Sequence, residues 1–323
     1  MLPDVPDISY IVAAYNAAGT VARAIESVLA QEGVDVEVIV ADDCSVDETA
    51  HIVRSYGSEK VRLVSLPDNR GPGGARNAAI ADARGRWIGI VDADDEILPQ
   101  RTKRLLTCAD VPAVDAVVDN LVIKSEGKER LLHRTADLAR LGNLSLAHFI
   151  DHNMLFAGRF NLGYLKPLIR RDFIRANGIA YDDQLRIGED YLFLARTLSR
   201  GAYCIVEPEA GYLYHSAKGS ISHVMNLNDV EAMIRADRDF LATFPVDAAA
   251  RAAQLRRIKN LEEAAAFLTL VDHIKQRSVA DAVKDVLRNP AAARHLKMPI
   301  TARLKRAMVA LQTPSSAFRR VSQ

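Results

Sequence analysis

An acidic cluster, Asp92-Ala93-Asp94-Asp95, follows directly after an apolar run of the sequence. If the backbone stays extended, alternate side chains share one face, so Asp92 and Asp94 would point to the same side. Carboxylate oxygens at this spacing suit Mg²⁺ or Mn²⁺ carrying a diphosphate, whereas burying three carboxylates without a cation would be costly. The cluster therefore favours a site for a divalent metal and a phosphate over its alternative, a solvated acidic turn.

Two earlier apolar runs end in residues that could bind a nucleoside. Tyr15 follows Ala13 and Ala14, and an exposed aromatic ring can stack on a base. Taken alone, Tyr15 is equally consistent with an ordinary loop residue. The second run ends in Asp42 and Asp43, where a carboxylate can accept the N3–H of uracil or the hydroxyls of a ribose. Capping of the following helix is the alternative for this pair.

A glycine-rich segment, residues 69–77, leads from a loop into a helix. Glycine lets a ligand approach the backbone closely, and the N–H groups at the start of a helix favour phosphate. Gly73 and Arg76 are therefore candidate nucleotide-binding residues, with a plain tight turn as the alternative. The glycine spacing does not match G-x-G-x-x-G, which argues against a dinucleotide-binding oxidoreductase.

A second acidic pair, Glu189-Asp190, opens an apolar helical pattern. The N-terminus of a helix favours negative charge, so capping alone could explain the pair. A carboxylate in this place could also remove a proton from a substrate hydroxyl as a general base. Both interpretations stay open on these residues alone.

Histidine and cysteine spacing gives weaker evidence for a metal site. His215 ends the segment Tyr212-Leu213-Tyr214-His215 and is followed by residues 216–220, which include Lys218. A single histidine is more often structural than a ligand, and the other seven show no metal-binding spacing. The three cysteines lie far apart without a C-x-x-C pair, so we expect neither a disulfide framework nor a zinc site.

Alternating strands and helices must position these residues. We expect buried strands at residues 8–13, 36–41, 61–66 and 87–91. Helices are expected between them, at residues 20–29, from a capping box at 45–48 to about 56, and at 73–83. This alternation predicts βαβ units and a largely parallel sheet, in which ligands bind outside the carboxyl ends of the strands.

The rest of the chain has a different pattern. Strands are expected at residues 114–118, 202–206 and 211–214, and a helix is expected at residues 191–198. Ala-rich helices are expected after them, at residues 230–240, 250–270 and 279–287. The predicted layout is an α/β body of residues 1–225 and a helical C-terminal region of residues 226–323.

Composition limits the class of protein and its surroundings. Hydrophobic residues make up 49% and charged residues 26%, as in a globular protein, and the net charge of +1 argues against a nucleic-acid partner. There is no signal-peptide pattern and no apolar run near the length of a membrane helix, so we expect a cytoplasmic protein. The sequence after Asp285 has basic residues but no acidic ones. This pattern fits either a solvated helix or contact with an anionic membrane surface, on the inner face of the plasma membrane.

Together, the motifs resemble those of family 2 of the GT-A glycosyltransferases. The resemblance spans about 210 residues and rests on Ala-Ala-Tyr-Asn (13–16), Asp-Asp-Cys-Ser (42–45), Asn-Arg-Gly…Ala-Arg-Asn (69–77), Asp-Ala-Asp-Asp (92–95), Gly-Glu-Asp (188–190) and Tyr-Leu-Tyr-His (212–215). It implies a GT-A, Rossmann-like α/β fold with a mixed, mainly parallel sheet, flanking helices and a helical C-terminal region. Family members often carry Pro where this sequence has Ala13.

The resemblance also implies a donor site. Tyr15 and Asp43 would contact uracil, with Asp42 in support, and Asp92 would face the ribose or the metal. Ala13 and Ala93 would be further nucleotide-sugar-binding residues.

For the reaction, the resemblance implies Asp94 as the ligand of Mn²⁺ or Mg²⁺ and His215 as a group that helps hold the metal or diphosphate. Asp190 would be the catalytic base, and Lys218 belongs to a loop that would close over the donor. A single displacement at the sugar carbon would then invert its configuration.

A narrower resemblance is to bacterial exopolysaccharide glucosyltransferases of the succinoglycan type. It rests on residues 161–167, 185–190 and 207–215. It implies a UDP-glucose donor and a glycan or lipid-linked oligosaccharide acceptor. Lys166 and Glu189 are the candidate residues on the acceptor side, and the C-terminal helices could cover the acceptor, form a homodimer or contact a membrane.

Two other classes of function compete with this hypothesis. A nucleotidyltransferase would usually need a glycine-rich basic loop soon after the first strand, but residues 16–20 contain no Lys. A catalytically inactive sugar-nucleotide-binding protein is disfavoured because Asp92, Asp94 and Asp190 are all present.

Overall fold

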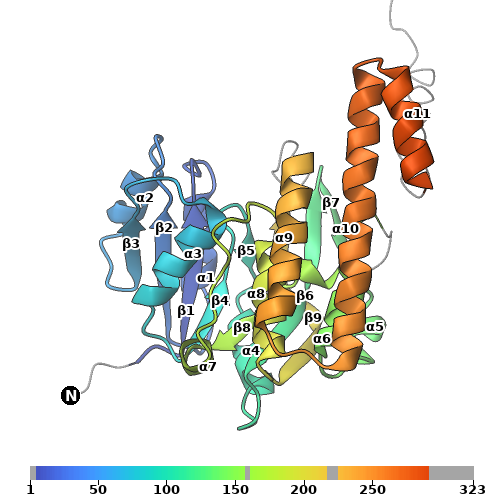
Figure 1. Ribbon diagram of the computed structural model, residues 1–323. Helices are drawn as coiled ribbons and strands as arrows, with labels where there is room; N and C mark the ends of the chain where they lie inside the picture. Colours follow the sequence, from blue (N-terminus) through green and yellow to red (C-terminus); the bar gives the residue numbers. More distant parts are fainter. Residues whose placement is uncertain (1–4, 157–160, 217–224, 291–323) are drawn as a thin grey trace, which may run out of the picture. The chain divides into compact units, whose positions relative to one another are not determined.

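The computed structural model describes residues 5–156, 161–216 and 225–290 (Figure 1). The chain divides into two compact units, Met1–Leu261 and Glu262–Gln323. The strands are β1 (Ile8–Ala14), β2 (Val36–Asp42), β3 (Val61–Ser65), β4 (Trp87–Ile90), β5 (Glu96–Ile97), β6 (Ala116–Ser125), β7 (Lys128–Leu131), β8 (Leu168–Arg170) and β9 (Cys204–His215). The helices are α1 (Val21–Leu29), α2 (Thr49–Ser55), α3 (Gly71–Asp82), α4 (Arg101–Cys108), α5 (Thr135–Ala139), α6 (Leu146–Asp151), the 3₁₀ helix η1 (Leu162–Tyr164), α7 (Arg171–Ala176), α8 (Glu189–Ser199), α9 (Leu227–Thr243), α10 (Ala248–Lys275) and α11 (Val279–Arg288).

One sheet, with strand order β3-β2-β1-β4-β8-β6-β9-β5, runs through the first unit, and β7 pairs with β6. Its first four strands are parallel and are the four expected from the apolar runs. Each is followed by a helix or by the acidic cluster, and every residue of β2 is buried, as strands covered on both faces must be. The expected mixed, mainly parallel sheet is confirmed, because the longest ladders, β1–β2 and β6–β9, are both parallel.

The far half of the sheet differs from the prediction at β9. We expected two strands, 202–206 and 211–214, but β9 is one strand from Cys204 to His215. The ladder with β6 shifts register next to Asn120, which pairs with Ala210, while Asp119 pairs with Glu207. The shift accommodates Pro208, which has no backbone N–H to donate to the ladder. The strand therefore continues through a bulge to its C-terminal residue, His215.

The capping box predicted at residues 45–48 is wrong, because α2 begins only at Thr49. The Ser45 hydroxyl accepts the N–H of Asn16 instead, and Asp47 accepts the N–H of Ala18. These two bonds join the loop after β1 to the loop after β2. The polar side chains that were expected to start a helix therefore hold the two loops at one edge of the sheet.

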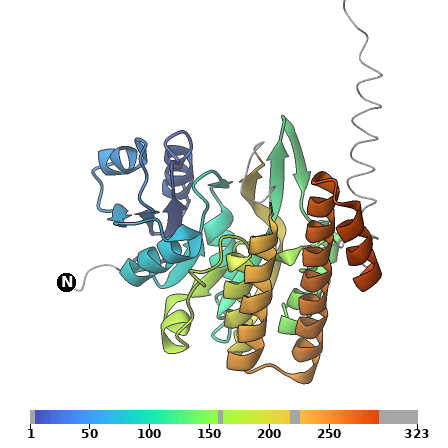
Figure 2. The same ribbon diagram turned by 45° about the horizontal axis from the view of Figure 1, so that its top comes forward.

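The C-terminal helices form as expected, with α9 lying beside the first part of α10 in both views (Figures 1 and 2). Residues 248–261 of α10 belong to the first compact unit and residues 262–275 to the second. A functional boundary at residue 226 stays a prediction. None of the helices within the described ranges has the length and apolarity that a membrane crossing requires.

Candidate active site

A cavity of about 620 Å³ lies at the carboxyl ends of β1, β2 and β4. This is the edge of the sheet at which the sequence predicted a ligand site. Ten of the predicted site residues line it: Ala13, Tyr15, Asp43, Arg76, Asp92, Ala93, Asp94, Lys166, Glu189 and Asp190. Asp42, Gly73 and His215 are outside the lining formed by the described residues, and Lys218 is outside the described ranges.

One end of the cavity has the features of a nucleoside site. The ring of Tyr15 is 52% exposed on the loop after β1. Asp43 is buried, and its Oδ1 accepts the N–H of Arg70 at 2.7 Å. Burial raises the pKa of Asp43, although the backbone N–H groups of Arg70 and Gly71 oppose the rise. This end therefore combines an exposed flat ring with a buried hydrogen-bonding carboxyl group.

Asp42, the last residue of β2, is buried behind this end of the cavity. Its Oδ1 has no hydrogen-bond partner within the part of the chain that the structure describes. A buried polar atom of this kind calls for a partner, and Asp42 adjoins the cavity-lining Asp43. This position is compatible with the supporting role expected for Asp42.

The centre of the cavity holds five charged side chains in one network. Arg76 contacts Asp92 at 2.7 Å, Glu189 at 2.8 Å and Asp190 at 3.3 Å. Lys166 contacts both Asp92 and Asp190 at 2.6 Å. Two cations thus join a carboxylate at the end of β4 to two carboxylates at the start of α8.

This network changes how readily its members ionise. Burial opposes ionisation of Asp92, but Lys166 and Arg76 together hold its pKa well below the ordinary value. Burial likewise opposes the charged form of Lys166, yet Asp190 and Asp92 raise the pKa of Lys166 far above its ordinary value. Burial and the neighbouring Asp190 charge raise the pKa of Glu189. The network therefore keeps Asp92 and Lys166 charged although both are largely buried.

Asp95, the third carboxylate of the acidic cluster, makes its hydrogen bonds to neighbouring strand residues. Asp95 is fully buried and accepts the hydroxyl of Tyr212 and the backbone N–H of His215, both at 2.8 Å. The Tyr212 hydroxyl in turn accepts the N–H of Asp92 at 3.0 Å. Asp95 thus ties the end of β4 to β9. Burial and the charges of Asp92 and Asp94 raise its pKa well above the ordinary value.

Asp94 is the carboxylate of the cluster that is available to a cation from solvent. It is exposed at the cavity rim, whereas Asp92 is paired with two cations and Asp95 is buried. Burial of part of its surface and the nearby Asp92 charge raise the pKa of Asp94, and a bound cation would oppose that effect. His215 lines the same adjoining hollow of about 480 Å³ as Asp94.

The imidazole of His215 does not bond Asp94 in this structure. Its Nε2 lies 2.5 Å from Glu96 Oε1, and Arg23 and Lys124 approach the same oxygen at 3.7 and 3.9 Å. Among the described residues there is no cluster of three His, Cys, Asp or Glu side chains that could hold a metal alone. The residues present therefore fit an ion that takes further oxygen ligands from a substrate.

Gly73 packs against protein and not against the cavity. A Cβ at this position would lie 2.6 Å from the carbonyl oxygen of Asp182, so α3 approaches residues 181–183 closely only with glycine there. Asn77, one turn later, exchanges two hydrogen bonds with the backbone of Tyr181. These contacts hold the segment that leads into Glu189 and Asp190.

Several cavity-lining residues were not predicted from the sequence. They are Tyr164, Arg186, Tyr214, Met233 and Arg257. Tyr164 and Tyr214 lie within motifs that were noticed, and their rings meet edge to face at 6.0 Å. Met233 of α9 and Arg257 of α10 had no local signal, because nothing in a helical pattern tells which cavity a helix will border.

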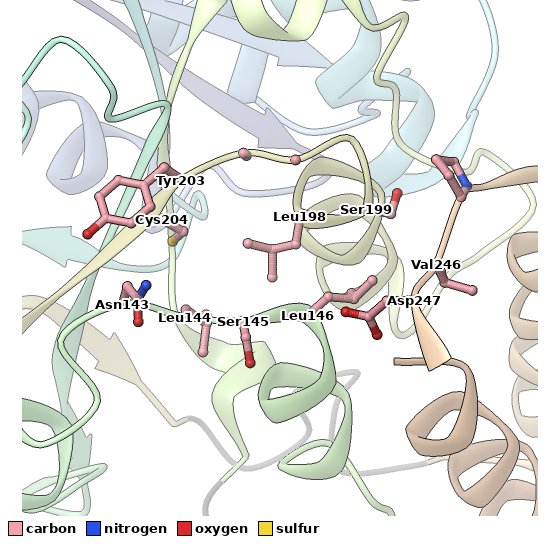
Figure 3. A pocket seen from close by; sticks show the side chains of 13 residues that line it. Asn143, Leu144, Ser145, Leu146, Leu198, Ser199, Tyr203, Cys204, Val246 and Asp247 are labelled. Atoms are coloured by element: carbon pink, nitrogen blue, oxygen red, sulfur yellow. The ribbon is translucent and has the colours of Figure 1, made fainter. Parts of the chain in front are cut away.

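A second, smaller pocket of about 270 Å³ lies elsewhere in the first unit (Figure 3). Its walls come from residues 143–146, from the end of α8 through the start of β9, and from residues 245–247. None of the predicted site residues that fall within the described ranges lines it. The charged network and the nucleoside end therefore single out the larger cavity as the candidate active site.

The chain is similar in sequence to known glycosyltransferases and to a polysaccharide biosynthesis protein. Residues 9–173 match the model of Glycosyl transferase family 2. The chain is 49% identical over 313 residues to the succinoglycan biosynthesis protein ExoO of Rhizobium meliloti, covering 97% of this chain and 90% of that protein.

Solved structures show the same fold at low sequence identity. Residues 1–349 of TarS from S. aureus, in complex with UDP-GlcNAc, superpose with a TM-score of 0.64 at 21% identity, over 80% of this chain and 73% of that chain. The mannosyltransferase PcManGT from Pyrobaculum calidifontis, in complex with GDP-Man and Mn²⁺, gives a TM-score of 0.57 at 18% identity, over 97% and 82%. The GT-A fold expected from the motifs is confirmed.

Proposed function

The chain belongs to family 2 of the glycosyltransferases, and from this premise we propose that it transfers a sugar, with glucose as the first candidate, from a UDP-sugar to a glycan or lipid-linked oligosaccharide during exopolysaccharide synthesis. The observation that carries the proposal is one cavity with a nucleoside-type end at Tyr15 and Asp43 and a carboxylate, Asp190, at its centre. The succinoglycan relative supports the pathway and the UDP-GlcNAc complex of TarS supports the donor class.

The exposed ring of Tyr15 and the buried carboxyl group of Asp43 support a set of proposed donor contacts. Tyr15 would stack on the uracil ring and Asp43 would accept its N3–H, with Asp42 behind it. Ala13, Arg76 and Ala93 line the same cavity. The diphosphate would then lie beside Asp94, which leaves the sugar carbon facing the middle of the cavity.

Asp190 is the proposed catalytic base. It lines the cavity, and Lys166 and Arg76 contact its two oxygens, so its carboxylate is held in one orientation. It would take the proton from the acceptor hydroxyl while that oxygen bonds to the sugar carbon and the bond to UDP breaks. Since attack and departure are on opposite faces, one displacement inverts the anomeric carbon.

We propose Mn²⁺ or Mg²⁺ as the cofactor, with Asp94 as its protein ligand and His215 as a second group near the diphosphate. When bound, such an ion neutralises charge on the departing diphosphate. His215 would first have to exchange Glu96 for the new partner. The exposed Asp94 and the Mn²⁺ complex of PcManGT support this assignment.

Removal of the divalent ion tests the proposed cofactor. We expect chelation with EDTA to abolish UDP release and added Mn²⁺ or Mg²⁺ to restore it. Asp94→Ala should lose the metal-dependent part of UDP binding, measured by titration calorimetry with and without the ion. Full activity of the wild type in EDTA would remove the metal from the proposal.

The proposed function as a whole is tested at Asp190. We expect Asp190→Asn to keep UDP binding and to lose sugar transfer by about 10²–10⁴-fold, the usual contribution of a general base. Transfer is measured by UDP release over a panel of UDP-sugars, with membrane glycolipids as acceptor. Asp183→Asn, at an exposed carboxylate of the same segment, is the control and should be unaffected.

The products separate the competing classes of function. UDP among the products supports sugar transfer, whereas pyrophosphate would identify a nucleotidyltransferase. A wild-type protein that binds UDP-sugar but releases no UDP, even to water, would be an inactive binding protein. Near-normal turnover by Asp190→Asn would leave the transferase intact and assign the base to another residue.

We also propose that residues 1–225 form the catalytic domain and that residues 226–323 serve the acceptor side. Met233 and Arg257 support the second role because both line the cavity. Work on a lipid-linked acceptor with a cytoplasmic nucleotide sugar would take place at the inner face of the plasma membrane. A homodimer through the C-terminal helices is the competing role for that region.

A further inference from the structure

Helix α11 carries a line of exposed aliphatic side chains. Val279, Val283 and Leu287, four residues apart, are 72%, 53% and 76% exposed. No residue of this helix is buried. Residues at this spacing lie on one face of an α-helix, so three apolar groups stand side by side in water. A contiguous exposed apolar patch is typical of a surface that contacts a partner or a membrane.

The helix already uses a different face for packing within its own unit. Ala282, Asp285 and Val286 are its half-buried residues, and the Asp285 carboxylate lies 2.7 Å from His273 Nδ1 of α10. Figure 1 shows α11 folded back beside the last turns of α10. The exposed line therefore lies on another side of the helix from the contact with α10.

Charge identifies the kind of surface that this face fits. Residues 262–323 contain 11 Lys and Arg against 5 Asp and Glu, whereas residues 1–261 contain 31 against 36. On α11 itself, Lys284 and Arg288 directly follow two members of the exposed line and are exposed, and Asp281 and Asp285 balance their charge. The positive excess of the unit therefore comes from the sequence that follows Asp285. After Asp285 the sequence has no acidic residue. An anionic surface would attract this unit and repel the rest of the chain.

We propose that α11 is an interfacial helix that docks on an anionic lipid surface. Val279, Val283 and Leu287 would enter the boundary between headgroups and acyl chains. Lys284 and Arg288 would keep their charged ends among lipid phosphates while their aliphatic stems lie along the apolar region. Apolar insertion and basic attraction act together, as stable attachment of a short helix requires.

A second copy of the chain fits this face less well. A stable interface buries roughly 800 Å² on each partner, which three aliphatic side chains do not provide. Two copies would also bring together two units of the same positive charge. A lipid surface provides both the apolar layer and the opposite charge, so it is the occupant that the observations favour.

Vesicle sedimentation with the full-length protein tests the proposal. The probes are vesicles of phosphatidylcholine alone and with phosphatidylglycerol added, at low and high salt. We expect wild type to sediment with the anionic vesicles and to dissociate at high salt. The partition coefficient of V279S/V283S/L287S onto anionic vesicles should be at least about 10-fold lower, because the apolar contribution is lost.

A composition-matched control separates this face from general surface hydrophobicity. V5S/V111S/L255S also removes two Val and one Leu, from exposed positions of the first unit, and should bind like wild type. Circular dichroism and urea unfolding report that all three proteins are folded, so the outcome is independent of the transferase assignment. Equal sedimentation of the three proteins, or none by wild type, would overturn the proposal. A wild-type dimer that V279S/V283S/L287S dissociates, without vesicle binding, would instead assign the face to self-association.

Discussion

Lys166 contacts a carboxylate on the proposed donor side of the cavity and the carboxylate of the proposed base. Its ammonium group is 2.6 Å from Asp92 and 2.6 Å from Asp190, which come from β4's end and from α8. Arg101, itself buried, donates to the backbone oxygen of Lys166 at 2.7 Å. Lys166 was expected on the acceptor side. From its contacts with Asp92 and Asp190 we predict that Lys166 positions the proposed base, and Arg101 holds the Lys166 backbone.

We expect Lys166→Met to lower the rate of transfer by about 10²-fold or more, because a positioned buried charge is lost beside Asp190. UDP binding should fall less, since Asp43 and Tyr15 are untouched. Steady-state kinetics of UDP release, with kcat and donor KM determined separately, gives the comparison.

Two further variants show whether the effect belongs to the position of the charge. Lys166→Arg restores the charge with a wider group and should recover part of kcat. Lys60→Met removes an exposed cation paired with Asp35 and should change neither parameter. An unchanged kcat in Lys166→Met would exclude Lys166 from positioning Asp190.

Among the elements, the start of α8 determines where Asp190, the proposed base, lies. Gly188 precedes the helix with φ +87°, a conformation that side chains with a Cβ rarely adopt. A Cβ there would also lie 2.7 Å from the Cε of Met233. The turn into α8 is thus tight enough that the next two residues, Glu189 and Asp190, point into the charged network.

Gly188→Ala should therefore lower both stability and turnover. The left-handed backbone alone costs about 1–2 kcal/mol with Ala, and displacement of the first turn of α8 would move Asp190. Gly178→Ala is a matched control, because Gly178 also has positive φ (+59°) but no atom within 4 Å of the place that a Cβ would take. Urea unfolding and UDP release should show both variants destabilised but only Gly188→Ala slowed. Equal turnover of the two would contradict this account.

At the scale of the whole molecule, the beginning of α10 completes the first unit. Arg257 pairs with Asp237 of α9 at 2.9 Å, lies 3.7 Å above the ring of Tyr191 in α8, and donates to the backbone oxygen of Asn153. Asn260 exchanges two hydrogen bonds with the backbone of Leu155, a cavity-lining residue. The C-terminal helices therefore build part of the cavity wall.

Arg257→Met should destabilise the first unit by about 3–5 kcal/mol, because Asp237 would be left buried without its cation. Burial already raises the pKa of Asp237 against the opposing effect of Arg257. The double variant Asp237→Leu/Arg257→Met should recover most of the loss, since no unpaired charge remains. Urea unfolding measures all three proteins. A free energy of unfolding for Arg257→Met within about 1 kcal/mol of the wild-type value would contradict the prediction. So would a double variant that is no more stable than Arg257→Met.

The sequence by itself determined the alternation of strands and helices, the parallel start of the sheet and the strand ends that carry Tyr15, Asp43 and Asp94. Local periodicity encodes which residues are buried, and the carboxyl ends of parallel strands meet at one edge. Only the tertiary structure decided that Lys166 bridges Asp92 and Asp190 and that His215 pairs with Glu96. It also decided that Gly73 serves packing and that α9 and α10 border the cavity. These contacts join segments far apart in the chain, and the partner of a charged side chain depends on which of many compatible neighbours the packing brings within reach.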